Sequence, residues 1–177
     1  MKKLLFVPLL LASFFAALPA LAMEGVGVIN MRDAVLGTQV AQDVLKALSE
    51  ETDYAANIEQ ATLLQTERQA SAEKLQKDVE TLSQDEIVTM QREIQEKGQD
   101  IEFIIGKVQA KQNQTVEKIF ADINPVLQKI LSELIAAKEV KMLLAQENVL
   151  FSDPALILTD DVTSLLDVAL AEGQNKE

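Results

Sequence analysis

The feature that most constrains the fold is the stretch from Thr38 to Lys138, which has helical periodicity and a single proline, Pro125. Its second half places apolar residues at the a and d positions of a heptad repeat: Ile87, Met90, Ile94, Ile101, Ile104 and Val108. Such spacing is typical of one face of a coiled-coil helix. An arm of ~45 residues would be ~68 Å long, whereas helices in globular domains average ~11–12 residues. The stretch therefore predicts a projecting helical arm.

A turn near residue 83 divides this stretch into two helices. Ser83 is followed three residues later by Glu86, the spacing of a capping box, which starts a new helix. If the chain folds back here, opposed residues have numbers that sum to about 166. Apolar residues then face each other in most pairs: Val79 with Ile87, Ala72 with Ile94, Ile58 with Val108 and Val40 with Val126. We predict an antiparallel helical hairpin over 38–138 with its tip near 83; one continuous coiled-coil rod is the alternative.

Several residues predict that this arm is not rigid. Gly98 and Gly106 interrupt the return helix, each at a cost of about 1 kcal/mol relative to alanine. Lys97 and Lys111 fall on the apolar seam, where they should weaken the hairpin locally. Pro125 predicts a kink or a restart of the helix. We therefore expect the arm to move more readily than the two ends of the mature chain.

Short apolar segments on either side of the hairpin predict a few strands and one helix. Glu24–Asn30 contains β-branched residues and glycines and reads as a short strand. Val140–Leu144 and Val149–Phe151 read as two further strands. Thr159 is placed to begin a final helix, with acidic residues following in its first turn.

Together these segments, 23–37 and 139–177, predict a small body at the base of the arm. The predicted fold class is mainly α, with a long antiparallel helical hairpin projecting from a short-stranded β body. Three short strands and one helix bury too little apolar surface to be stable alone, and their edges favour pairing between chains. We therefore expect an oligomerisation core, made of Val26, Val28, Ile29, Val149, Leu150, Phe151, Leu158, Val162, Leu165 and Leu166.

Residues 1–22 have the features of a secretory signal peptide. Lys2 and Lys3 precede an almost wholly apolar run that ends at Leu18, and Ala20 and Ala22 are the small residues that signal peptidase requires. The run is shorter than the ~20 residues of a membrane span, so we expect cleavage after Ala22 and a periplasmic protein; an uncleaved anchor is the alternative. Without the leader the chain carries 14 basic and 28 acidic residues, a net charge of −14.

The composition excludes several functional classes. The chain has no Cys and no His, which excludes disulfides, thiol nucleophiles, Ser-His-Asp triads and the usual zinc, haem and iron–sulfur ligands. A net charge of −12 argues against non-specific nucleic-acid binding, which needs clustered Lys and Arg. Asp153, Asp160 and Asp161 could form a cation site, but the last two are better explained as first-turn helix acids. We predict no catalytic residue, no metal, no cofactor and no enzymatic activity.

The arrangement of short motifs resembles the Skp (OmpH-like) family of periplasmic chaperones. The motifs are V-x-N-M at Val28–Met31, x-x-P-x-x-x-x-I at Ile123–Ile130, and D-P followed by L-T-x-D-V-x-x-x-L within Asp153–Leu166. The likeness covers nearly the whole mature chain. Two features depart from the family: Ile157 stands where an Asp is usual, and the chain is acidic whereas well-studied members are basic.

The resemblance implies a homotrimer whose hairpins hold unfolded outer-membrane β-barrel proteins without ATP. Basic members are thought to attract clients and lipopolysaccharide by charge, so we transfer no lipopolysaccharide site to this acidic chain; peripheral contact with the membrane stays an open alternative. Apolar surface should then hold the client. Phe103 and Ile105 exceed what the seam can bury beside Ile101 and Ile104, and they are our candidate client-binding residues. The competing interpretation is a structural coiled-coil spacer or stalk of the cell envelope.

Overall fold

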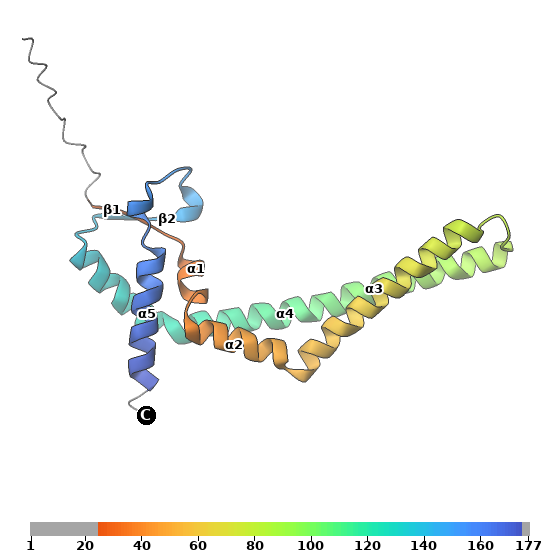
Figure 1. Cartoon of the computed structure of the whole chain (residues 1–177), viewed down its shortest axis with the longest axis horizontal. Helices are drawn as coiled ribbons and strands as arrows, with labels where there is room; N and C mark the ends of the chain where they lie inside the picture. Colours follow the sequence, from red (N-terminus) through yellow and green to blue (C-terminus); the bar gives the residue numbers. More distant parts are fainter. Residues whose placement is uncertain (1–24, 175–177) are drawn as a thin grey trace, which may run out of the picture.

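The computed structural model describes residues 25–174, which form a small body and a long helical hairpin that projects from it (Figure 1). The expected signal peptide, with its cleavage site after Ala22, lies outside the described residues. In chain order the elements are β1 (Val26–Ile29), α1 (Met31–Leu36), α2 (Gln39–Glu50), α3 (Thr52–Asp78), α4 (Gln84–Ala137), β2 (Met142–Ala145), the 3-10 turns η1 (Gln146–Asn148) and η2 (Pro154–Leu156), and α5 (Thr159–Gln174). The predicted fold class, mainly α with a small β body, is confirmed.

The hairpin turns where the capping box predicts. The hydroxyl of Ser83 accepts a hydrogen bond from the Glu86 N–H, and the Glu86 carboxylate accepts one from the Ser83 N–H at 2.8 Å. Hydrogen bonds from the Ser83 hydroxyl and then from its backbone N–H hold the pKa of Glu86 below its usual value. The box therefore contributes stability above the unfolded pKa of this carboxyl group and loses it as the pH falls through the lowered folded value.

The outgoing half of the hairpin consists of two helices, α2 and α3, where the sequence predicted one. Glu51 lies between α2 and α3 with extended backbone angles, φ −63° and ψ 125°. Five consecutive polar residues, Ser49 to Asp53, interrupt the apolar pattern at this point, so an apolar stripe does not hold the two helices in line. Figure 1 shows the resulting corner between α2 and α3.

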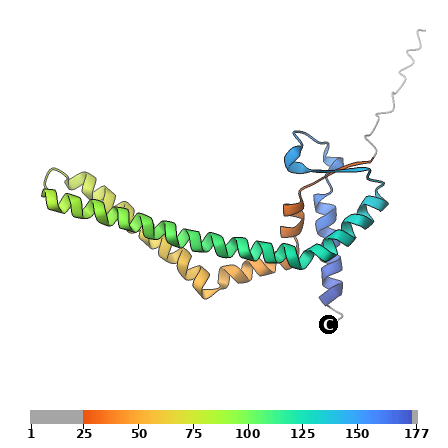
Figure 2. The same cartoon turned by 180° about the vertical axis from the view of Figure 1, so that it is seen from behind.

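The return helix, in contrast, continues through Pro125. Proline lacks an N–H, so the Ala121 carbonyl loses its partner within the helix, and such positions kink helices. Figure 2 shows α4 changing direction in the part that approaches the body. The predicted kink is therefore present, and the predicted alternative of a restart is not.

The body contains a two-stranded parallel sheet, in which β1 pairs with β2 from Val26↔Met142 to Ile29↔Ala145. Parallel strands cannot be joined by a tight turn and need a long crossover. Here the whole hairpin is that crossover. Glu139, with φ 52°, lies in the turn that redirects the chain from α4 into β2.

The prediction of a strand at Val149–Phe151 is wrong. The Val149 N–H donates to the Gln146 carbonyl at 3.1 Å, closing the turn η1, and the chain then runs into solvent. The segment that lies beside the other edge of β1 is instead Ile157–Leu158: Val28 and Ile157 form a parallel bridge, and the Leu158 N–H donates to the Val28 carbonyl at 2.8 Å. Three consecutive apolar residues fit a strand and an exposed loop equally well, and only pairing distinguishes them.

The hydrophobic core of the body includes the base of the hairpin. It joins residues of β1, α1, α2, α5 and the segment just before α5 to one face of α4: Ile29, Ala34, Val35, Ala41, Ile119, Ile123, Leu127, Ile130, Leu131, Leu134, Leu158, Val162 and Leu166. Hydrogen bonds tie α1 to α5 as well, since the Asn30 N–H donates to the Thr159 hydroxyl and the Thr163 hydroxyl donates to the Ala34 carbonyl. The core therefore crosses the predicted boundaries at 38 and 138.

The two glycines of α4 lead to a prediction about stability. A Cβ at Gly98 would meet Arg68 Nε at 3.6 Å, an ordinary contact, and a Cβ at Gly106 would meet nothing within 4 Å. Gly98→Ala with Gly106→Ala should therefore stabilise the protein by about 1–2 kcal/mol, because alanine is the better helix former. Urea unfolding followed by circular dichroism, at one protein concentration, would measure this.

Gly25 supplies the contrasting control for that measurement. It has φ 90°, and a Cβ there would lie 3.0 Å from the Lys141 side chain. Gly25→Ala should destabilise the protein for the same chemical change. A double variant in α4 that unfolds no later than the wild type would contradict the idea that these glycines weaken the arm.

Candidate functional site

The described part of the chain carries no arrangement that suggests a metal or membrane-spanning function. No group of three or more His, Cys, Asp or Glu residues is placed to hold a metal ion within residues 25–174. No helix in the same range is long and apolar enough to cross a membrane. Exposed apolar side chains and charge pairs lie on both the body and the arm.

Half of the predicted oligomerisation core is already buried within one chain. Val28, Ile29, Leu158, Val162 and Leu166 are all buried, the last two completely. The premise that these residues lack partners within the chain is wrong, because α1, α4 and the start of α2 complete the core around them. Sequence reasoning assigned α4 wholly to the arm and so missed this packing.

The rest of the predicted set is more accessible. Val26 and Val149 are half-buried, and Leu165 is 40% exposed on α5. Leu150 and Phe151 are 107% and 88% exposed, in the loop that follows β2, and Met142 of β2 itself is exposed. β2 has β1 on one edge, and within the described residues no strand lies along its other edge. The body therefore presents an exposed apolar loop and, within the described residues, an edge of β2 that pairs with no strand.

On the arm, the structure separates Phe103 and Ile105 from their apolar neighbours. Ile101 and Ile104 are buried against α3, whereas Phe103 is 65% and Ile105 is 42% exposed. The Lys107 ammonium lies 4.4 Å from the centre of the Phe103 ring, in cation–π contact. Both predicted candidates thus lie outside the hairpin seam.

The arm exposes further large apolar residues that the sequence interpretation did not single out: Ile58, Leu63, Val79 and Val88. Ile58 and Val79 were expected on the seam. The half-buried stripe of α3 consists instead of Tyr54, Asn57, Ala61, Leu64, Ser71, Leu75 and Asp78, which recur at three, four or seven residues. That spacing is visible in the sequence, but more than half of its members are polar or small, so the apolar pattern favoured the wrong face.

Both seam lysines have acidic partners on the outgoing arm. Lys97 pairs with Glu67 of α3, and Lys111 Nζ lies 2.9 Å from a carboxylate oxygen of Glu51. The residue numbers sum to 164 and 162, close to the predicted register, and Arg68 lies against Gly98 with a sum of 166. The lysines therefore cross-link the two arms of the hairpin, where the sequence predicted only local weakening.

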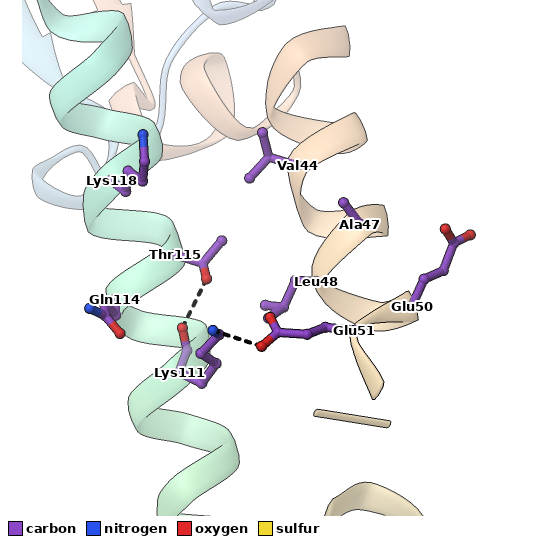
Figure 3. A pocket seen from close by; sticks show the side chains of 9 residues that line it. All are labelled: Val44, Ala47, Leu48, Glu50, Glu51, Lys111, Gln114, Thr115 and Lys118. Carbon is purple, nitrogen blue, oxygen red and sulfur yellow. Dashed lines mark hydrogen bonds and ion pairs between the residues drawn. The ribbon is translucent and has the colours of Figure 1, made fainter. Parts of the chain in front are cut away.

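The base of the hairpin is hollowed beside the second of these pairs. An open cavity of about 840 Å³ lies between α2 and α4, lined by Val44, Ala47, Leu48, Glu50, Glu51, Lys111, Gln114, Thr115 and Lys118. Figure 3 shows the Glu51 side chain reaching across this space to Lys111, while Glu50 points away from α4. Packing between α2 and α4 is thus incomplete where the outgoing arm bends.

Comparison with known proteins gives one family and one structural neighbour to report. The model of the family described as outer membrane protein (OmpH-like) matches residues 25–166. A crystal structure from Caulobacter crescentus CB15, described as a candidate outer membrane chaperone (OmpH-like), is 24% identical and superimposes with a TM-score of 0.48 over 88% of this chain and 91% of that chain. No curated protein matches this chain significantly in sequence.

Proposed function

This chain belongs to the OmpH-like outer membrane protein family, and we propose that it is an ATP-independent holdase chaperone of the periplasm. In this proposal it binds unfolded outer-membrane β-barrel proteins and prevents their aggregation. The observation that carries the proposal is the arm, which projects from the body and keeps Phe103, Ile105 and four other large apolar residues exposed between residues 58 and 105. A holdase needs only a surface that prefers unfolded chains, and that preference requires no nucleotide.

The direct test is the aggregation of a denatured outer-membrane β-barrel protein after dilution, followed by light scattering. A several-fold excess of this protein, without nucleotide, should suppress the scattering. An equally acidic protein of similar size without exposed apolar residues is the control for non-specific effects. If scattering is unchanged at that excess, the holdase proposal fails and the coiled-coil spacer of the envelope becomes the better interpretation.

We also propose that the body associates with copies of itself, as a homotrimer. The exposed apolar residues Leu150 and Phe151 follow β2 in the chain, and within the described residues no strand pairs with the outer edge of β2. An open edge next to exposed apolar side chains favours pairing with another chain.

This proposal predicts the effect of charges in the loop. Leu150→Asp with Phe151→Asp should weaken assembly at least ~30-fold, since removing two central apolar contacts typically costs 2 kcal/mol or more. Analytical ultracentrifugation over a range of concentrations would measure the shift toward monomer. Val28→Asp is unsuitable, because it would place a charge inside the folded chain and unfold it.

The matched control for assembly introduces the same charges on the arm. Phe103→Asp with Ile105→Asp alters two exposed apolar residues far along α4 and should leave the sedimentation coefficient of the oligomer intact. Should the loop variant sediment as the wild type does, the interface lies elsewhere. Should the arm variant dissociate instead, the arms and not the body hold the subunits together.

A further inference from the structure

Glu51 has an unusual position in the hairpin. It is the single residue between α2 and α3: its N–H donates to the Leu48 carbonyl at 3.2 Å, and its own carbonyl accepts from the Ala55 N–H at 2.9 Å. It is the N-cap residue of α3, yet its side chain makes no capping hydrogen bond. The carboxylate extends instead to Lys111 of α4, at 2.9 Å (Figure 3).

Little else holds this corner of the chain against α4. Leu48 is the last buried residue of the outgoing chain, and α3 has no buried residue at all. The open cavity of about 840 Å³ separates α2 from α4 immediately before the corner. Because full burial ends at Leu48 and the first turns of α3 contribute only half-buried residues, an interaction at residue 51 can decide where the base of α3 lies.

The partner of Glu51 is equally constrained. Lys111 continues the heptad of Ile101, Ile104 and Val108, so its position on α4 faces the outgoing arm. An ammonium group on an apolar seam is costly unless it is paired or reaches water. Of the other charged groups lining the cavity, Lys118 is a like charge and Glu50 points away from α4. Glu51 is therefore the acid that is placed to neutralise Lys111.

We propose that the Glu51–Lys111 ion pair is a latch that holds the α2–α3 corner against α4 and so sets how far the base of the arm opens. The pair is partly exposed, with 44% of the Lys111 side chain and 42% of the Glu51 side chain accessible. A partly exposed ion pair of this kind should shift the equilibrium between the closed and the open position of the corner by only about two- to fivefold, and salt screens it. The arm would therefore open as ionic strength rises. This inference concerns the shape of the arm and does not depend on what the arm binds.

The chain has no cysteine, so its opening can be measured directly with spin labels. Ala56→Cys on α3 and Ala110→Cys on α4 are both exposed and flank the corner. Double electron–electron resonance would report the distribution of distances between the two labels at low and moderate salt. The variants to compare are Glu51→Gln, the matched control Glu50→Gln, and the swap Glu51→Lys with Lys111→Glu.

The latch predicts a different result for each variant. Glu51→Gln should enlarge the long-distance population about two- to fivefold at low salt, and salt should then have little further effect. Glu50→Gln should match the wild type, because it removes an equal charge one residue away. The swap should restore the short-distance population. If Glu51→Gln and Glu50→Gln behave alike, or if the swap remains open, the latch is refuted, whether or not the protein proves to be a holdase.

Discussion

Leu166→Ala is expected to lower the free energy of unfolding by about 2–5 kcal/mol, the range for removing a fully buried leucine from a core. Leu166 has no exposed surface and lies among residues of α1, α4 and β1 that come from distant parts of the chain. Truncation would leave a cavity where α5 crosses the base of the hairpin. A protein of this size has a total stability of roughly 5–15 kcal/mol, so the loss would be a large part of it.

The adjacent residue provides the control for this prediction. Leu165→Ala changes the same atoms one position earlier, where the side chain is 40% exposed, and it should cost about 1 kcal/mol or less. Urea unfolding of both variants at one fixed concentration would separate them, because stability coupled to assembly depends on concentration. Equal losses for the two variants would mean that the core of the body is organised differently in solution.

Phe103→Ser with Ile105→Ser is expected to weaken the holding of an unfolded β-barrel protein by about 10- to 100-fold. Each side chain should contribute about 0.7–1.4 kcal/mol when a client covers it, given that full burial of such a residue contributes ~1.5–3 kcal/mol and that both are already partly covered. The midpoint concentration for suppressing light scattering would give the affinity. Sedimentation should be unchanged, since both residues lie on the arm.

A second pair of substitutions controls for changes to α4 itself. Gln109→Ser with Gln112→Ser alters two exposed polar residues of the same helix and should leave holding unchanged. Because apolar contacts are insensitive to screening, we also expect holding to change little between low and moderate salt. If the glutamine variant lost as much affinity as the apolar variant, a general loss of helix stability would explain both.

The helical part of this fold could be predicted because its determinants are local. The heptad from Ile87 to Val108 specifies one face of α4, and Ser83 and Glu86 satisfy backbone groups within one turn. Both signals lie within a few residues of the structure they specify, so the hairpin, its tip and its approximate register followed from the sequence. The two seam lysines were found in the same way, although their acidic partners were not.

Tertiary structure decided the body, because its contacts join residues that are far apart in the sequence. β1 pairs with β2 across the whole hairpin, and Val28 meets Ile157 rather than the apolar segment Val149–Phe151. A strand of four residues carries too little pattern to name its partner, and a three-residue apolar run fits an exposed loop as well. Which of the predicted interface residues are inside one chain and which face solvent was therefore beyond the sequence.

The exposed residues of the arm were also predicted only in part from the sequence. The sequence determined that α4 carries more apolar residues than one seam can bury, which identified Phe103 and Ile105. Only the packing of α3 showed that Ile58 and Val79 are exposed too, and only the corner at Glu51 brought a carboxylate to Lys111. Helical periodicity fixes which residues share a face, whereas the rotation and bending of two helices against each other depend on every side chain between them.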